Sequence, residues 1–364
     1  MKDNKIFLIL AIPFIVYIIA RPGILYYDSY HYLSISCGLD TLRNEAPLSQ
    51  FFFPFLPCSV ILIKVILYGC CALSVWFLNK TWKNAGYYAM LMPLFLYEFF
   101  RWENDTIAYV LMFASVYFFY RSYREKRFWV NQGVSSFLIL AACGFWGGAL
   151  FLPFLLSVKK KAWFPRIMSV VFAYVFGGEL LHWWIGSFHY LMAETVVNLA
   201  GLYLLPGVLL AIVGLPVSLR KPGWPAIVLT MFKAKLAVLS MIFLPEGITL
   251  LVERFPRMER PVLFASIGMI ILSSVTFPLQ EPAVGVHSAI GFALELSENG
   301  KIEHDWDIGY MVLWNGGDTN RHGMPSPDKF TGLAVSRTDQ NCPMVKNFGK
   351  YSVWDCSQEQ IIKT

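Results

Sequence analysis

The stretch Asp305-Trp306-Asp307-Ile308-Gly309-Tyr310 marks the change between two parts of this chain. It follows the last strongly apolar segment and opens the long polar region of the sequence. Of the 364 residues, 56% are hydrophobic and only 15% are charged. A soluble domain of this length carries about 25% charged residues, and the deficit here is concentrated in residues 1–280. The composition therefore predicts a membrane domain over residues 1–280 and a short outside-facing soluble domain over residues 281–364.

Apolar runs of about 15–20 residues recur before that boundary, close to the length that a helix needs to cross a bilayer core. The runs 128–157 and 224–252 are each expected to form a hairpin, turning near residues 144–148 and 233–235. These turns keep the basic clusters on one side of the membrane and remove lysines from the middle of a span. The sequence thus predicts a polytopic α-helical membrane protein of about eleven transmembrane helices with a small C-terminal α/β domain. The single spans are expected near residues 6–20, 57–78, 85–100, 106–120, 164–180, 198–217 and 261–278.

The net charge of +6 lies mainly in short loops, such as Arg121–Arg127 and Lys159–Lys161. Basic residues in short loops mark the inner side of a membrane protein, so this charge indicates topology and not nucleic-acid binding. The first apolar segment has no small-residue cleavage site after it, which favours a membrane span over a signal peptide. We expect an integral protein of a prokaryotic plasma membrane or of the endoplasmic reticulum, in contact with membrane lipid, with its site on the outer or lumenal face.

Carboxylates recur on the predicted outer side. Asp28 lies in the first loop, Glu103 and Asp105 lie at a turn between two spans, and Glu194 lies in a later loop. Each has an ordinary explanation: a solvated loop for Glu103 and Asp105, a helix cap for Asp28, and an ion pair for Glu194. Together they form a pattern that a divalent cation would use, because Mg²⁺ and Mn²⁺ prefer carboxylate oxygens.

The basic and sulfur-containing residues leave alternatives open. Lys233 and Lys235 either snorkel at a hairpin tip or bind a lipid phosphate. No histidine is expected to be a metal ligand. If the tail lies outside, a disulfide between Cys342 and Cys356 fits that compartment. The remaining cysteines are interpreted as small buried hydrophobic residues: Cys37, Cys58, Cys70, Cys71 and Cys143.

Four stretches resemble the motifs of the catalytic subunit of oligosaccharyltransferase, a family of GT-C membrane glycosyltransferases. Residues 27–32 (Tyr-Asp-Ser-Tyr-His-Tyr) resemble its first acidic motif, and residues 102–107 (Trp-Glu-Asn-Asp-Thr-Ile) resemble its second. Residues 192–195 (Met-Ala-Glu-Thr) resemble the motif of its mid-chain external loop, and residues 305–310 resemble the WWDYG signature that opens its soluble domain. The chain departs from the family in having Asp305 for the first Trp of that signature and in its short tail.

The resemblance implies a Mn²⁺ or Mg²⁺ site and two substrates, a lipid-linked glycan donor and an acceptor polypeptide. Lys235 stands where the family has an arginine that contacts the donor phosphate, with Lys233 beside it. The other implied roles are metal binding by Asp28, Glu103 and Asp105, contact of Asp28 and Glu194 with the acceptor amide, and acceptor binding by Asp305, Trp306 and Asp307.

Three functions follow as hypotheses. The first is metal-dependent transfer of a glycan from a dolichyl or polyprenyl phosphate or pyrophosphate carrier to Asn. The second is a GT-C transferase that uses a lipid-phosphate sugar and a different acceptor. The third is a non-catalytic membrane subunit that binds lipid or a partner subunit. The altered signature leaves room for the second, whereas the retained acidic residues argue against the third.

Overall fold

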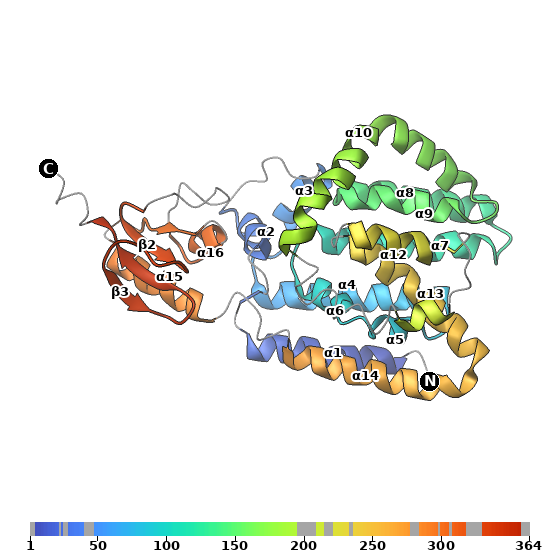
Figure 1. The fold of residues 1–364 in the computed structure, drawn as a ribbon, viewed down its shortest axis with the longest axis horizontal. Helices are drawn as coiled ribbons and strands as arrows, with labels where there is room; N and C mark the ends of the chain where they lie inside the picture. The colour runs from blue at the N-terminus through green and yellow to red at the C-terminus, as the bar shows by residue number, and fades with distance from the viewer. Residues whose placement is uncertain are drawn as a thin grey trace.

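The structure is a computed structural model that is mostly helical, with one small sheet (Figure 1). This composition confirms the predicted combination of a helical part and a C-terminal part that contains strands. The described residues are 4–21, 23–24, 28–39, 47–194, 209–214, 221–232, 236–276, 284–297, 299–305, 308–317 and 330–357.

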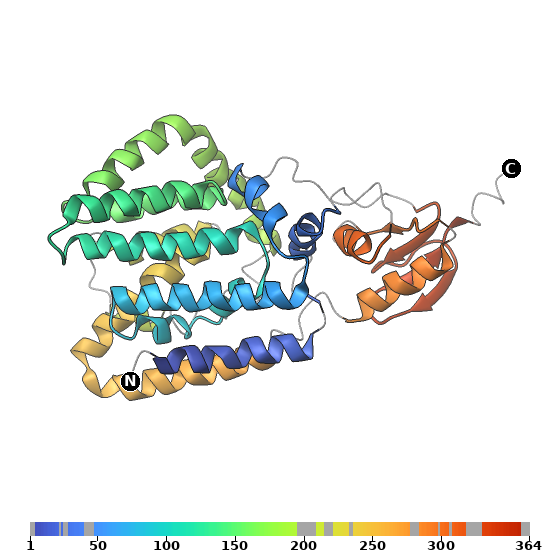
Figure 2. The ribbon, with the colours of Figure 1, turned by 180° about the vertical axis from the view of Figure 1, so that it is seen from behind.

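The helical part begins with α1 (Asn4–Ala20) and ends with α14 (Glu259–Thr276), and these two helices pack side by side (Figure 2). At its centre, α7 (Asn104–Ser122) packs against α4 (Val60–Thr81) and α8 (Phe128–Cys143). The other helices are α2 (Asp28–Ser36), α3 (Pro47–Phe52), η1 (Phe53–Phe55), α5 (Ala85–Ala89), α6 (Leu94–Phe100), η2 (Gly147–Phe151), α9 (Leu152–Ser157), α10 (Trp163–Glu194), α12 (Gly223–Phe232), α13 (Ala237–Arg254) and η4 (Pro256–Met258).

Helix α1 shows how the sequence builds this bundle. Its inward face carries apolar residues at helical spacing, and Ile6, Leu10 and Phe14 are buried. Its outward face is also apolar, with Leu8 and Ile19 each more than 70% exposed. The same outward exposure of large apolar side chains occurs on α10 and α14, where it includes Ile167, Val170, Val171, Tyr174, Val175, Phe264, Ile271, Leu272 and Val275.

The expectation of about eleven spans is not supported. Among the described residues, two helical segments are long and apolar enough to cross a membrane, Val60–Thr81 and Pro256–Thr276. Most other predicted spans contain helices that are shorter or interrupted. The predicted span 85–100 is divided into α5 and α6, because the chain turns between them ahead of Pro93. Helix α10 instead continues to Glu194, past the end expected near residue 180 and through a kink at Phe176.

The two predicted hairpins correspond to pairs of helices. Within residues 128–157, α8 ends at Cys143 and η2 begins at Gly147, so the expected turn near residues 144–148 is confirmed. Within residues 224–252, α12 and α13 pack against each other. The turn between them, residues 233–235, lies outside the described residues, as does most of the predicted span 198–217.

The described residues of the C-terminal part form two helices and a four-stranded sheet. Helix α15 (Val284–Leu296) packs against β2 and β4 through Val286, Ala289, Ile290 and Ala293, whose spacing places them on one face. The sheet order is β1-β2-β4-β3, with β1 and β2 parallel and the other pairs antiparallel. The remaining elements are β1 (Glu303–His304), α16 (Gly309–Trp314), β2 (Leu333–Ser336), β3 (Met344–Asn347) and β4 (Ser352–Asp355).

Four cysteines form disulfides. The suggested Cys342–Cys356 pair is present, next to the strands of the C-terminal sheet. Cys37 is bonded to Cys58, so the interpretation of these two residues as small hydrophobic side chains was wrong. An apolar neighbourhood hides this pairing in the sequence, since only the fold brings the end of α2 close to the start of α4. The other three cysteines are free, and Cys70 and Cys71 are buried, as expected.

Candidate functional site

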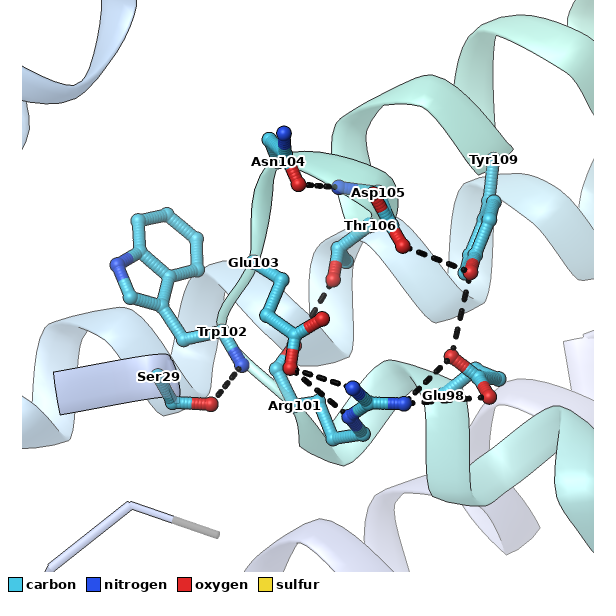
Figure 3. A network of polar contacts seen from close by, with 9 residues as sticks. All are labelled: Ser29, Glu98, Arg101, Trp102, Glu103, Asn104, Asp105, Thr106 and Tyr109. Carbon is cyan, nitrogen blue, oxygen red and sulfur yellow. Dashed lines mark hydrogen bonds and ion pairs between the residues drawn. The ribbon is translucent and has the colours of Figure 1, made fainter. Parts of the chain in front are cut away.

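The predicted acidic pair lies at a turn between α6 and α7, which we call the acid turn and define as residues 98–105 (Figure 3). Helix α6 ends at Phe100, Arg101 and Glu103 have extended backbone, and α7 begins at Asn104. Thr106 fixes the turn because its Oγ1 donates to the Arg101 carbonyl at 2.8 Å and its N–H donates to the Glu103 carbonyl at 3.1 Å. The turn therefore presents its carboxylates at the positive end of the α7 dipole, where negative charge is favourable.

A guanidinium group occupies the middle of the acid turn. Arg101 donates from Nη2 and Nε to Glu103 Oε1, at 2.6 and 3.0 Å. Its Nη1 lies 3.4 Å from Glu98 Oε2. The Tyr109 hydroxyl lies 3.3 Å from the same Glu98 oxygen and 3.5 Å from Asp105 Oδ2 (Figure 3). The four charged side chains thus form one network with three carboxylates and one guanidinium, and both Glu103 and Asp105 are buried.

The acid turn contacts the first predicted motif directly. The Trp102 N–H donates to Ser29 Oγ at 3.0 Å, and Ser29 is the second residue of α2. The first residue of α2 is Asp28, whose side chain lies outside the described part of the structure. Phe53 packs its ring edge-on against Trp102, with ring centroids 5.3 Å apart. Two of the four motifs that carry the resemblance are therefore adjacent, with Asp28 next to a residue that is bonded to the acid turn.

The same helix contacts the C-terminal part. The Tyr30 hydroxyl lies 2.8 Å from His287 Nε2, and the rings of His31 and Tyr310 have centroids 4.3 Å apart. Helix α2 thus lies between the bundle and the C-terminal part, as both ribbon views show (Figures 1 and 2). It brings the start of α16, which follows the predicted acceptor-binding stretch, to the same helix as the acid turn.

The other predicted site residues have different outcomes. Asp305 is buried and tied to the sheet: its Oδ1 accepts from Ser336 Oγ at 2.9 Å and its Oδ2 accepts from the Arg337 N–H at 2.8 Å. Its visible role is to hold the strand ends together. Glu194 is the last residue of α10, which returns toward the α2 end of the bundle, but its side chain lies outside the described residues (Figure 1). Outside them as well are Trp306, Asp307, Lys233 and Lys235.

The acid turn partly fits a divalent cation. Glu103 and Asp105 supply two hard oxygen-donor groups of the kind that Mg²⁺ and Mn²⁺ prefer. Arg101 donates twice to Glu103 Oε1, so a cation would bind Glu103 through Oε2 or share Oε1 with Arg101. Within the described residues, the structure contains no group of three or more His, Cys, Asp or Glu side chains placed to hold a metal ion. A set of three such ligands at the acid turn would therefore need a side chain from outside the described residues.

Several residues of this site were not identified from the sequence. Glu98 and Arg101 are three residues apart, a spacing that favours ion pairs on a helix and was the available signal. Ser29 and Tyr109 carry no such signal, because their contacts depend on how α2 packs against the turn and on which way one hydroxyl points. The pair lies at a turn between two helices, as expected, but its counter-charge was missed.

The chain matches no protein-family model, and no curated protein matches it.

Proposed function

We propose that this chain is a membrane-embedded, metal-dependent glycosyltransferase that transfers a glycan from a lipid-linked donor to Asn of an acceptor polypeptide. The observation that carries the proposal is the position of α2. Its first turn is bonded to the acid turn through Ser29 and Trp102, and its His31 contacts Tyr310. Three stretches that are far apart in the sequence, and that resemble three motifs of one enzyme family, thus meet at a single helix.

Membrane embedding is supported by the outer surface of the bundle. A helix that is apolar on all sides is either buried in protein or surrounded by lipid. On α1, both the buried face and the exposed face are apolar, and α10 and α14 likewise expose large apolar side chains. We propose that these exposed faces contact lipid tails, in a plasma membrane or in the endoplasmic reticulum.

The two disulfides support the sidedness of this proposal. Cys37–Cys58 joins the end of α2 to the start of α4, and Cys342–Cys356 lies in the C-terminal sheet. Disulfides persist in oxidising compartments, such as the periplasm and the endoplasmic reticulum lumen. Both pairs belong to segments that the proposal assigns to the outer or lumenal face, together with the acid turn.

In the proposed reaction, Asp28 and Glu194 accept hydrogen bonds from the N–H groups of the acceptor amide. These bonds hold the amide and oppose the delocalisation that makes its nitrogen a poor nucleophile. Glu103 and Asp105 would hold the cation, which when bound supplies positive charge against the departing phosphate. Arg101 orients Glu103 through its two hydrogen bonds. Lys235 and Lys233 would bind the donor phosphate, and Trp306 and Asp307 would contact the acceptor.

The test uses full-length protein in detergent with lipid-linked oligosaccharide, Mn²⁺ and a fluorescent Asn-X-Thr peptide. We expect a slower-migrating glycopeptide, and no product from a peptide with Gln in place of Asn. Asp28→Ala, Glu194→Ala and the double variant Glu103→Gln/Asp105→Asn should each reduce the rate about 100-fold or more, the usual effect of losing a group that stabilises the transition state.

Glu125→Gln serves as the matched control. It also removes one carboxylate, but Glu125 is exposed, pairs with Arg121 and lies beyond the opposite end of α7. We expect its rate to equal that of the wild type. Full activity in the double variant Glu103→Gln/Asp105→Asn would show that the acid turn has no catalytic role.

One observation favours a second candidate, a GT-C transferase with an acceptor other than Asn. Asp305 replaces the first Trp of the family signature, and both of its carboxylate oxygens are engaged by Ser336 and Arg337. A residue held in this way is less able to read an acceptor side chain. Absence of glycopeptide from a wild-type protein that still binds Mn²⁺ would favour this candidate, and the assay would then be repeated with glycan acceptors.

A further inference from the structure

Two lysines meet at one buried carboxylate near the far end of α7. Glu246 Oε1 lies 2.7 Å from Lys221 Nζ and 3.5 Å from Lys159 Nζ. Its other oxygen, Oε2, accepts a hydrogen bond from the Tyr120 hydroxyl at 3.3 Å. The lysines come from different segments, Lys159 from the turn after α9 and Lys221 from just before α12. One negative charge therefore holds two ammonium groups together, which leaves one positive charge in excess.

The turn that carries Lys159 is fixed by hydrogen bonds to its backbone. Side chains from three residues outside the turn donate to four of its carbonyl groups, which holds the backbone of the turn in place. Arg166 donates to the carbonyls of Ser157 and Lys159, each at 3.2 Å, Gln132 donates to that of Lys161 at 3.0 Å, and Tyr123 donates to that of Lys160.

The ammonium groups of this site reach the surface. The side chains of Lys159 and Lys221 are 20% and 25% exposed, whereas that of Glu246 is only 5% exposed. An ammonium group has three N–H donors, and the contacts with Glu246 use one from each lysine. Lys160 and Lys161 are exposed on the same turn, and Arg166 is exposed in the first turn of α10. The combination of spare donors, excess positive charge and a fixed backbone suits an anion.

This site is separate from the acid turn. Helix α7 begins at the acid turn with Asn104, and Tyr120 lies close to its other end. A helix rises about 1.5 Å per residue, so the two sites are roughly 24 Å apart along α7. The two sites therefore lie near opposite ends of the bundle, and the lysine site cannot belong to the acid turn.

We propose that Lys159 and Lys221 form a binding site for a phosphate group, carried by an anionic lipid headgroup or free in solution, at the end of the bundle opposite the acid turn. The phosphate oxygens accept hydrogen bonds from both ammonium groups, while Glu246 fixes the spacing between them. Charge-assisted hydrogen bonds of this kind are about twice as strong as neutral ones. Snorkelling alone would leave the two lysines pointing independently toward water, and the shared carboxylate opposes that arrangement.

The pKa of Lys159 is set by burial and by the charges around it, and a bound phosphate would be one more such charge. Burial lowers the pKa of Lys159 and the neighbouring charge of Lys221 lowers it further, while Glu246 acts in the opposite direction. A bound phosphate would add negative charge beside Lys159 and raise its pKa again. Binding is therefore expected to stabilise the protonated, fully charged form of the pair.

The test measures binding of dioctanoyl phosphatidic acid to full-length protein in detergent, with dioctanoylglycerol as the probe that lacks phosphate. We expect binding of the phosphatidic acid only. The variant Lys159→Gln/Lys221→Gln loses two charge-assisted hydrogen bonds, so its affinity should fall about tenfold or more. The control Lys126→Gln/Arg127→Gln removes the same charge from exposed residues of a neighbouring loop and should change the affinity less than about twofold.

A third variant guards against misfolding. Lys159→Gln/Lys221→Gln/Glu246→Gln also removes the carboxylate that would otherwise be buried without its lysines, and it should unfold at a temperature close to that of the wild type while binding as weakly as the double variant. Inorganic phosphate as competitor separates the sources: displacement identifies the phosphate group alone as the ligand, and failure to displace identifies the lipid form. Equal weakening in the control Lys126→Gln/Arg127→Gln, binding of dioctanoylglycerol, or wild-type affinity in the triple variant would each overturn the proposal.

Discussion

The Tyr30 hydroxyl lies 2.8 Å from His287 Nε2, a contact between residues 257 positions apart that joins α2 to α15. The same hydroxyl accepts a hydrogen bond from the Ile24 N–H at 3.2 Å. Burial raises the pKa of Tyr30 to about 12, so this phenol keeps its proton at any physiological pH. Gly23 is required beside it, because a Cβ at that position would collide with the Tyr30 hydroxyl. The contact links the segment before the acid turn to the C-terminal part.

This contact predicts a pH-dependent stability. Burial lowers the pKa of His287 from its ordinary value of 6.5, and the charge of Arg21 lowers it further, while Asn315 acts in the opposite direction. Between the two pKa values the unfolded chain binds a proton that the folded protein does not. The stability that comes from keeping His287 neutral is therefore complete above pH 6.5. This contribution is lost as the pH falls through the folded pKa of His287. We expect a slope of up to about 1.4 kcal/mol per pH unit in this window.

Thermal unfolding in detergent between about pH 7.5 and pH 5 measures this slope. His287→Gln keeps a polar side chain of similar reach but cannot be protonated, so the contribution of this position to the slope should disappear. An unchanged pH dependence in His287→Gln would contradict the prediction.

Removal of Arg101 is expected to destabilise the acid turn. Its guanidinium lies between Glu98 and Glu103, and all three side chains are at most 15% exposed. Arg101→Gln leaves these carboxylates close together without their shared positive charge. Loss of one partner from a buried ion pair costs about 3–5 kcal/mol, so we expect a clearly lower unfolding temperature at pH 7.5.

Arg121→Gln is the control for this prediction. It breaks the 2.6 Å pair between Arg121 and Glu125, which is geometrically similar but exposed to solvent. Water screens such a pair, so we expect no measurable change in the unfolding temperature. Equal effects of the two substitutions would mean that the acid turn is not the low-dielectric site that its burial indicates.

Residue patterns predicted the types of element better than their ends. Apolar runs located α1, α4, α7 and α14 to within a few residues, because lateral packing and lipid-like surroundings both require continuous apolar helices. The end of α10 was missed: the span was expected to end near residue 180, whereas the helix continues through Gly177 and Gly178 to Glu194. Helix propensity is a weak signal, and glycine costs only about 1 kcal/mol relative to alanine inside a helix.

The turn that holds the candidate site was predictable, but its contacts were not. Glu103 and Asp105 lie between two helices as expected, since charged residues at the end of an apolar run are visible in any sequence. Their contact with Arg101 was not, because the direction of a long side chain depends on the packing around it. For Asp305 the sequence favoured a binding role, whereas its carboxylate closes hydrogen bonds to a strand that begins 28 residues later.

Cysteine chemistry provides a direct test of the fold. The structure pairs Cys37 with Cys58 and Cys342 with Cys356, and leaves Cys70, Cys71 and Cys143 free. Alkylation of the denatured, unreduced protein should therefore add three groups, and reduction beforehand should raise the number to seven, the total in the sequence. Peptide mapping by mass spectrometry identifies the sites. Five added groups without reduction would mean that one of the two disulfides does not form.

The hydrogen bond between Ser29 and Trp102 is expected to couple α2 to the acid turn. The Trp102 N–H donates to Ser29 Oγ at 3.0 Å, and both residues are completely buried. Ser29→Ala leaves this N–H without its acceptor at a cost of about 1–3 kcal/mol. Because Asp28 precedes Ser29, the loss of this bond also frees the first turn of α2 to shift relative to Asp105, and we expect Mn²⁺ affinity to fall about tenfold or more.

Ser36→Ala separates this coupling from a general effect on α2. Ser36 Oγ donates to the Tyr32 carbonyl, one turn earlier in the same helix, and makes that bond at the end of α2 remote from Asp28. We expect wild-type Mn²⁺ affinity and only a small loss of thermal stability in this variant. If both serine variants lowered the unfolding temperature equally and left Mn²⁺ affinity unchanged, Ser29 would be a packing residue, and the link between α2 and the acid turn would carry no function.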